Sequence, residues 1–260
     1  MHIDEILHAI QRGETPRIPE CWGQGRTTFG GLTGAVLCQA AMKAVDEDRQ
    51  LKSLEVCFTR PFEALQPYRI ETDTLACGKT VTIVQVQIVQ GEKVRAVAQA
   101  NFVRRLNSDV HIDPFTAPNM LSIQEAEPLN DDALPEFFGR FEARVATSAM
   151  PFSGAEIAEL GGWMRFAVPP KEMREPHLVC LIDSWPPTAS PYYVGFKPLS
   201  TINWSIHFAH PATGLLPKDF VGYLSAVNYA EGGVSSSSAD IWHPDGQLLA
   251  KSIQTSIIYD

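Results

Sequence analysis

Hydrophobic and polar residues alternate along several segments in the first half of the chain. In residues 93–103 one side carries Val94, Ala96, Ala98, Ala100 and Phe102, and the other carries Lys93, Arg95, Gln99 and Asn101. A period of two residues is typical of a β-strand with one buried face. Strand-like runs at 54–58, 68–75 and 81–89 predict three further strands, and Gly78 and Gly91 mark turns between them.

The second half has a similar succession of strand-like segments. They lie at 140–147, 162–168, 201–208, 220–229, 234–242 and 248–259, and Pro244-Asp-Gly246 predicts a hairpin turn before the last of them. In 201–208, strict alternation places Ile202, Trp204, Ile206 and Phe208 on one face and Thr201, Asn203, Ser205 and His207 on the other. Gln254 shares a face of the last strand with Ser252 and Ser256, opposite Ile253 and Ile257.

Two further segments are apolar on nearly every side, which predicts buried helices. Residues 32–45 follow Gly30-Gly31, and residues 177–185 are stopped by Pro186-Pro187. The two glycines let the backbone come close to a neighbour or a ligand where the first helix begins. A short polar helix is expected at the N-terminus. Residues 107–135, with several Pro and Asp residues and weak periodicity, are expected to form a linker.

The chain also repeats itself. Phe58-Thr-Arg-Pro61 returns as Phe208-Ala-His-Pro211 at an offset of 150, and Gly78, Gly91 and Gln99 return as Gly233, Gly246 and Gln254 at an offset of 155. So long a period indicates a duplicated domain rather than a solenoid. We expect an α+β fold in which two tandem antiparallel sheets, of about five strands each, wrap their helices and form one continuous sheet. The expected domains are 1–106 and 136–260, joined by the linker 107–135.

Composition and charge narrow the class of function. A net charge of −9 and a pI near 5.3 argue against a nucleic-acid partner, which needs a basic field. The N-terminus lacks a secretory pattern and no apolar run approaches membrane-spanning length, so we expect a cytoplasmic protein without membrane insertion. The five cysteines have no metal-ligand spacing, and Cys38 and Cys180 are expected in the core. The spacing of His177, His207 and His210 does not favour a metal site.

Asp183 does not fit its surroundings. It follows the apolar run 178–182 and precedes Trp185, so burial is expected to raise the pKa of its carboxyl. The C-terminal end of its own helix also disfavours a negative charge. The alternative is a structural residue at the helix edge that bonds a loop amide. Thr201 and Gln254 are weak signals alone, and they gain meaning only in combination with Asp183.

These residues fall within motifs similar to those of the type II acyl-CoA thioesterase family, the double-hotdog enzymes. The motifs are Thr28-Phe-Gly-Gly31, Phe58-Thr-Arg-Pro61, Gly78-Lys-Thr80, Leu181-Ile-Asp183, Ser200-Thr-Ile-Asn-Trp-Ser-Ile-His-Phe208, Asp245-Gly246 and Ile253-Gln254. The resemblance runs from about residue 20 to the end and rests on the order and spacing of the motifs. By this resemblance Asp183, Thr201 and Gln254 form the catalytic set. Family members often carry Asp-His at Asn203-Trp204, and many carry Arg at His210, but neither departure touches that set.

The resemblance implies hydrolysis of an acyl thioester, with acyl-CoA as the expected substrate and a role in lipid metabolism. Asp183 is expected to be the general base for a water that Thr201 and Gln254 orient, and the helix start at Gly30 and Gly31 is expected to bind the oxyanion. We expect Trp185 and Trp204 along an apolar acyl channel. The candidates for contact with CoA phosphates are Arg60, Lys79, Arg104 and Arg105. No metal or organic cofactor is required, and the resemblance implies a homodimer or higher homo-oligomer joined through sheet edges.

Two other functions compete with hydrolysis. A hotdog-fold hydratase or dehydratase acting on enoyl thioesters usually needs an Asp and a His close together in the helix region. The first histidine after Asp183 is His207, on a distant strand. A non-catalytic acyl-thioester-binding protein has no need for three residues that activate water, so the presence of Asp183, Thr201 and Gln254 argues against it.

Overall fold

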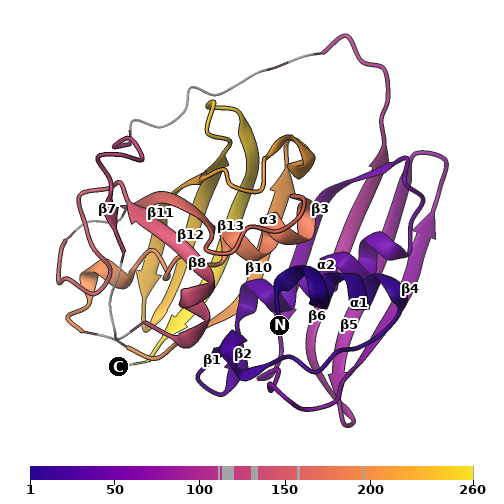
Figure 1. Cartoon of the computed structure of the whole chain (residues 1–260), viewed down its shortest axis with the longest axis horizontal. Coiled ribbons are helices and arrows are strands. Elements are labelled where there is room, and N and C mark those ends of the chain that lie inside the picture. Colours follow the sequence, from indigo (N-terminus) through magenta and orange to yellow (C-terminus); the bar gives the residue numbers. More distant parts are fainter. Residues whose placement is uncertain (111, 113–119, 130–133, 157–158, 196, 260) are drawn as a thin grey trace.

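One antiparallel sheet forms the body of the molecule. The computed structural model describes residues 1–110, 112, 120–129, 134–156, 159–195 and 197–259. Eleven strands of this described part join in the order β4-β5-β6-β3-β10-β13-β12-β11-β9-β8-β7 (Figure 1). Their bounds are β3 Arg49–Phe58, β4 Arg69–Cys77, β5 Val81–Gln90, β6 Lys93–Arg104, β7 Glu127–Pro128, β8 Phe141–Val145, β9 Glu159–Phe166, β10 Leu199–Phe208, β11 Val221–Glu231, β12 Val234–Trp242 and β13 Leu248–Ile258. A separate ribbon of β1 (Gly23–Gln24) and β2 (Thr27–Thr28) precedes them.

Every strand expected from the alternation is present, and β12 has its predicted bounds. Of the strands in this sheet, the first half (1–106) contributes four and the second half (136–260) six, which agrees with the expectation of about five each. The additional strand is β7, which lies inside the segment predicted as a linker and pairs with β8. The rest of 107–135 falls partly outside the described residues, and the domain boundaries drawn there stay a prediction.

The two halves meet where β3 pairs with β10 in the middle of the sheet. In this pairing Glu55 lies opposite Ser205, and the Ser205 hydroxyl donates to the Glu55 carboxylate across 2.9 Å. These two residues are 150 positions apart, which is the offset of the repeated Phe-x-x-Pro motif. When two equivalent strands pair antiparallel, the residue that faces its own counterpart marks a two-fold axis. The register therefore agrees with two duplicated halves related by an approximate two-fold at Glu55 and Ser205.

The same register corrects one pair in the repeat. Leu54 pairs with Ala100, and its counterpart Trp204 pairs with Gln254. Ala100 is therefore the structural equivalent of Gln254, whereas Gln99 is an exposed residue on the opposite face. The offset between the last strands of the two halves is one residue shorter than the sequence comparison indicated. As a result, the amide of Gln254 has no counterpart at this position in the first half.

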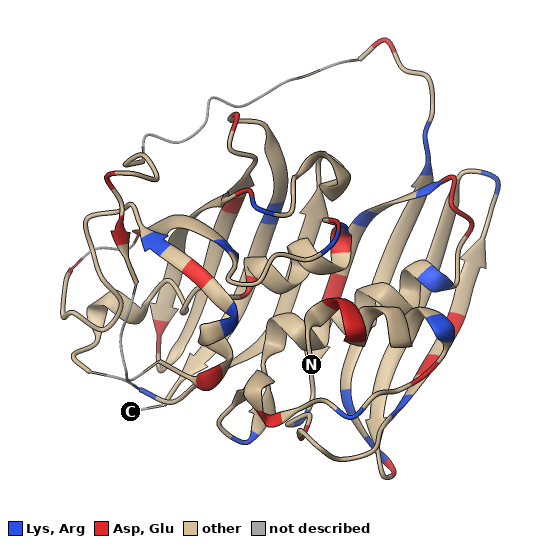
Figure 2. Ribbon diagram, viewed as in Figure 1, with Lys and Arg blue, Asp and Glu red and all other residues tan. Residues whose placement is uncertain are grey.

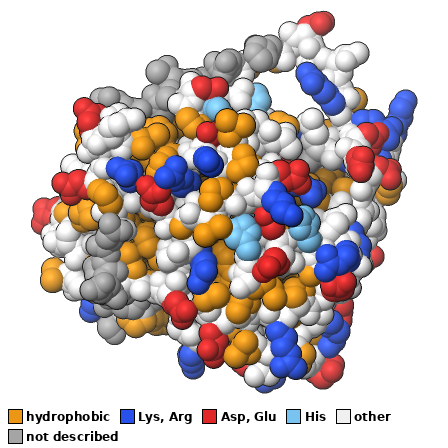
Figure 3. Space-filling view, viewed as in Figure 1, with side chains coloured by type: hydrophobic (Ala, Val, Ile, Leu, Met, Phe, Trp, Pro, Cys, Tyr) orange, Lys and Arg blue, Asp and Glu red, His pale blue; other side chains and the backbone are white. Residues whose placement is uncertain are grey.

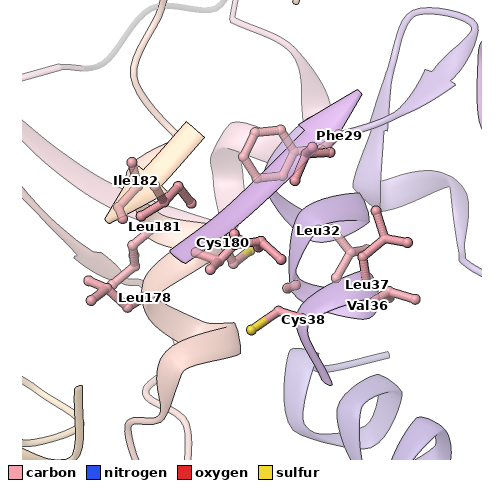
Figure 4. Packing of buried hydrophobic residues seen from close by; sticks show 14 of the residues in the cluster. Phe29, Leu32, Val36, Leu37, Cys38, Leu178, Cys180, Leu181 and Ile182 are labelled. Atoms are coloured by element: carbon pink, nitrogen blue, oxygen red, sulfur yellow. The ribbon is translucent and has the colours of Figure 1, made fainter. Parts of the chain in front are cut away.

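Three helices lie on one face of the sheet (Figure 1): α1 (Ile3–Arg12), α2 (Gly30–Lys43) and α3 (Glu175–Ile182). α2 is drawn almost entirely without charge colours in Figure 2, which agrees with the burial of this helix, and its one charged residue, Lys43, is exposed in the last turn. α2 packs directly on α3, and Figure 4 shows Cys38 and Cys180 between them. A Cβ at Gly31 would lie 2.6 Å from the Cys180 carbonyl oxygen. Glycine is required there because any side chain would push the two helices apart.

The N-terminal helix α1 is amphipathic rather than simply polar. Ile3, Ile6 and Ile10 are buried against the core, while its charged residues lie mostly outside. Its one buried carboxylate, Asp4, accepts a hydrogen bond of 2.9 Å from the His177 ring at the start of α3. α1 therefore contacts the second half of the chain as well as the first.

On the face seen in Figure 3, side chains of both charges are interspersed.

Candidate active site

A cavity of about 1140 Å³ opens where the N-terminus of α2 meets the C-terminal end of α3. Its wall comes from both halves of the chain. Aromatic and aliphatic side chains form much of it, namely Phe58, Phe62, Phe137, Phe138, Met150, Phe152 and Trp185. The cations on it are Arg26, Arg60 and Arg95, and Asp183 is the one carboxylate among the described residues of the wall. In a protein with a net charge of −9, this excess of cations around a single carboxylate sets the cavity apart.

Asp183 is the residue that ends α3. The helix stops at Ile182, one turn earlier than predicted, and Asp183 takes the C-cap position with φ −85° and ψ 1°. Its Oδ1 accepts a hydrogen bond of 2.7 Å from the Gln254 amide, and the carboxyl also accepts one from the Gly31 backbone N–H. Burial raises the pKa of Asp183 to about 7, although both hydrogen bonds act in the opposite direction. The predicted direction of this pKa shift is confirmed, and burial is its cause.

The first turn of α2 supplies the other side of this contact. Phe29 is the N-cap residue and its side chain makes no capping hydrogen bond. The free N–H groups at a helix start favour an acceptor with negative charge. The Asp183 carboxyl fills this role for Gly31, so the acid of the second half caps a helix of the first half. A Cβ at Gly30 would lie 2.6 Å from Asp183 Oδ2, so glycine is what allows this approach.

Gln254 reaches Asp183 from the part of β13, residues 252–256, whose inner face is polar. Ser252 and Ser256 share the face of Gln254 and are buried, while Ile253 on the other face is 47% exposed. This reverses the usual rule that apolar residues of a strand point inward. The inward polar face brings the Gln254 amide to the cavity.

Thr201 reaches the same face through a β-bulge. It pairs with Ser256, but Asn203 pairs with Thr255, so the register shifts between Thr201 and Asn203. Paired residues point to the same face, and Thr201 therefore shares the inner face with Gln254 and Trp204. The expectation from strict alternation, which placed Thr201 opposite Trp204, is wrong because a bulge inserts one extra residue. Ile202, which strict alternation placed on the same face as Trp204, is 39% exposed.

Six of the predicted site residues lie on the cavity wall, whereas Gly31 is not among the wall residues. The six are Asp183, Thr201, Gln254, Gly30, Trp185 and Arg60. Trp185 stacks on Tyr223 with ring centroids 5.7 Å apart. Trp204 does not line the cavity. It is 1% exposed in the core, where its indole N–H donates to Ser252 across 2.7 Å.

Lys79 and Arg104 lie at the wrong end of the sheet for the predicted contact with substrate. β3 runs towards the cavity, which Phe58 lines, while Arg49 at its other end pairs with Arg104. Lys79 follows β4 in the turn before β5, next to that far end. Arg104 forms an ion pair of 2.8 Å with Asp48 instead. Sequence reasoning had no means of telling which end of each strand faces the helix termini.

The sequence analysis missed several residues of the wall. Arg26, Arg95, Phe137 and Phe138 line the cavity, and Phe137 stacks on Phe29 with centroids 4.1 Å apart. Phe137 and Phe138 belong to a short 3₁₀ turn, Glu136–Arg140, just after the predicted linker. Two adjacent phenylalanines in a segment without strand or helix periodicity were the available signal, because such residues need apolar cover.

Two further results bear on the class of site. Among the described residues no group of three or more His, Cys, Asp or Glu side chains is placed to hold a metal ion. No helix in the part of the chain described by the structure has the length and apolarity to cross a membrane.

Comparisons with known proteins agree with the fold. A family model described as the acyl-CoA thioesterase N-terminal domain matches residues 18–103, and one described as the C-terminal domain matches residues 117–258. The chain is 26% identical to Acyl-CoA thioesterase 2 of Haemophilus influenzae, over 99% of this chain and 95% of that protein.

Solved structures show the same fold. A hot dog fold protein of Alicyclobacillus acidocaldarius superposes with a TM-score of 0.85 at 20% identity, covering 94% of this chain and 92% of that one. An acyl-CoA thioesterase II of Mycobacterium marinum gives a TM-score of 0.71 at 18% identity, covering 100% and 97%. With both domain models matched in order across most of its length, the chain belongs to the acyl-CoA thioesterase family, has its double-hotdog fold, and is a thioester hydrolase.

Proposed function

We propose that Asp183 is the general base of thioester hydrolysis and that Gln254 and Thr201 orient the attacking water. The observation that carries this proposal is the hydrogen bond between Gln254 and a partly buried carboxyl whose pKa is raised to about 7, on a cavity that Thr201 also lines. A base with a pKa near the working pH is both available in its charged form and strong enough to accept a proton. Both requirements follow here from burial.

The reaction then proceeds through transfer of one proton in each direction. Asp183 takes a proton from the water as its oxygen attacks the thioester carbonyl carbon. The carbonyl oxygen becomes an oxyanion, and its negative charge needs preorganised donors. When the carbon–sulfur bond breaks, the protonated Asp183 returns the proton to the thiolate, and the products are a free acid and a thiol. The base ends the cycle as a carboxylate.

The first half is proposed to bind the oxyanion. The Gly31 N–H donates to the Asp183 carboxyl and is therefore engaged with the proposed base. We assign oxyanion binding to the N–H of the preceding residue, Gly30, which lines the cavity. As the first residue of α2, Gly30 has no intrahelical acceptor for this N–H. The base and the oxyanion donor thus come from different halves of the duplicated fold.

The substrate is proposed to be acyl-CoA, with its nucleotide phosphates near Arg60. Arg60, Arg26 and Arg95 are the cations of the cavity wall, and all three come from the first half. Guanidinium groups suit phosphate because they offer several donors in a fixed geometry. The aromatic wall, with Phe137, Phe138 and Trp185, comes mainly from later in the chain and is proposed to hold the acyl group.

A thiol-release assay over a series of acyl-CoA esters tests the proposal. The parent protein is expected to release thiol, and the Asp183→Asn variant is expected to bind substrate but to lose at least a hundredfold in kcat, since general-base catalysis contributes about 10²–10⁴-fold. An Asp183→Asn variant that is folded, by circular dichroism, and hydrolyses at the parental rate would overturn the assignment of the base.

We also propose that the chain acts as a homodimer or higher homo-oligomer joined through a sheet edge. Of the two edge strands of the eleven-stranded sheet, β7 has two residues and β4 (Arg69–Cys77) has nine. β4 is therefore the edge with enough free backbone groups to pair with another strand. Sedimentation velocity tests this proposal, and a monomer at micromolar concentration would contradict it.

A further inference from the structure

Phe152 has a backbone conformation that is unusual for its residue type. In the described part of the chain two non-glycine residues have positive φ, Leu65 at 61° and Phe152 at 57°. For a bulky side chain this conformation is an outlier. Its intrinsic population is lower than that of ordinary conformations by a factor on the order of a few-fold to a hundredfold, so it persists only where the surroundings enforce it. Of these two residues, only Phe152 lines the cavity.

Four backbone hydrogen bonds hold the segment around Phe152 against the loop 190–195. The Phe152 N–H donates to the Ser190 carbonyl across 3.0 Å, and its carbonyl accepts from the Gly195 N–H across 3.2 Å. Gly154 N–H donates to the Tyr193 carbonyl across 3.1 Å, and Ala155 N–H donates to that of Pro191 across 2.8 Å. Because the donor and acceptor of Phe152 itself are both engaged, its peptide planes are fixed in the strained conformation.

The ring of Phe152 belongs to the apolar part of the cavity wall. It is half-buried and lines the cavity together with Met150 and Trp185. The arginines of the wall come from 26, 60 and 95, in the first half of the chain. Strained backbone conformations cluster at active sites and ligand-binding sites. Here the strained residue places an aromatic ring on the apolar part of the cavity wall, which is the position to contact a bound ligand.

We propose that Phe152 is a specificity-determining residue that limits the length of the acyl group. The inference rests on the proposed function, because it assigns the acyl group to the aromatic wall. In this arrangement the ring takes up space that additional methylene groups of a longer chain would fill. Each methylene that moves from water into an apolar pocket gains about fourfold in affinity. Removing the ring therefore extends the preferred chain length, and a larger ring shortens it.

The test compares Phe152→Gly, Phe152→Trp and, as a matched control, Leu65→Gly. Glycine adopts positive φ without strain, so Phe152→Gly relieves the backbone while it opens the cavity, and the variant is expected to fold. Leu65→Gly relieves the same kind of strain at an exposed site outside the cavity wall. The measurement is kcat/KM for straight-chain esters from butanoyl-CoA to palmitoyl-CoA. The chain-length preference is the kcat/KM of the longest good substrate divided by the kcat/KM of the shortest good substrate.

We expect Phe152→Gly to raise this ratio by about tenfold or more, Phe152→Trp to lower it, and Leu65→Gly to leave it unchanged. An unchanged ratio in both Phe152 variants, with acyl-CoA hydrolysis intact, would overturn the role of Phe152 and leave the proposed function standing. A shift of equal size in Leu65→Gly would also overturn it, because relief of strain rather than cavity shape would then explain the change. If the parent protein hydrolyses none of the esters, the proposed function fails first.

Discussion

Asp183→Asn should make the protein more stable at alkaline pH while it removes activity. Burial raises the pKa of Asp183 from 3.8 to about 7 in the folded chain. Between these two values the folded state keeps the proton and the unfolded state has lost it, so the stability of the parent protein falls as pH rises. A shift of about three units corresponds to about 4 kcal/mol, all of which is lost above pH 7.

The asparagine variant does not titrate, so it escapes this loss. Its side chain can still bond Gly31 and Gln254, because the Gln254 amide can turn to offer its oxygen. Relative to the parent, the free energy of unfolding of Asp183→Asn should therefore rise by about 3 kcal/mol between pH 5 and pH 9, which spans two units below the folded pKa. Urea denaturation of both proteins at the two pH values measures this difference.

Asp46→Asn is the matched control, since Asp46 lies exposed between α2 and β3 and its replacement removes one negative charge without touching the cavity or the edge strand β4. The reasoning is refuted if the stability difference between Asp183→Asn and the parent is the same at both pH values. It is also refuted if Asp46→Asn shows the same pH-dependent gain, because net charge alone would then account for it.

Four further outcomes are expected. In the parent protein, kcat/KM for acyl-CoA should rise as pH increases through about 7, because Asp183 must be a carboxylate to accept a proton; a profile flat from pH 5 to 9 contradicts this. Gly30→Ala should lose about a hundredfold in kcat, because its Cβ would lie 2.6 Å from Asp183 Oδ2 and displace the carboxyl. Gly214→Ala is the control and should retain parental kcat, because a Cβ there meets open space. Arg60→Ala should raise KM for acyl-CoA about fivefold, for a phosphate contact worth about 1 kcal/mol, and leave KM for the matching N-acetylcysteamine thioester unchanged. Lys79→Ala is the control and should change neither KM. An equal rise in both KM values for Arg60→Ala would count against the phosphate contact. Trp204→Phe should lower the free energy of unfolding by about 1–3 kcal/mol, since it leaves the buried Ser252 hydroxyl without its donor. KM for acyl-CoA should stay unchanged, and a raised KM would indicate that Trp204 contacts the acyl group after all.

Local pattern predicted the elements well where one face of a strand or helix is uniformly apolar. β6 shows this, since Ala96, Ala98, Ala100 and Phe102 are all buried as the alternation indicated. α2 was predicted because it is apolar on nearly every side. The repeat predicted that two similar halves exist, and the pairing of Glu55 with Ser205 shows where their axis lies. These features depend on short-range periodicity and on composition, which can be seen in the chain itself.

The site depended on features that periodicity does not carry. Asp183 was visible as a carboxylate in an apolar run, but its capping of α2 required the contact between two halves distant in sequence. The bulge after Thr201 added one residue to a strand, and alternation alone then assigned Thr201 to the wrong face. The inward polar face of β13 likewise contradicts a rule based on hydrophobicity.

Sequence alone was therefore sufficient to predict the class of fold, the duplicated halves, and Asp183 as an acid whose pKa its surroundings raise. Tertiary structure decided which side chains meet that acid, which end of the sheet carries the cavity, and why Lys79 lies far from it while Arg60 lines it. The physical reason is that burial tendencies are properties of single residues and their near neighbours. Register, bulges and helix-end contacts are set by the packing of the two halves against each other.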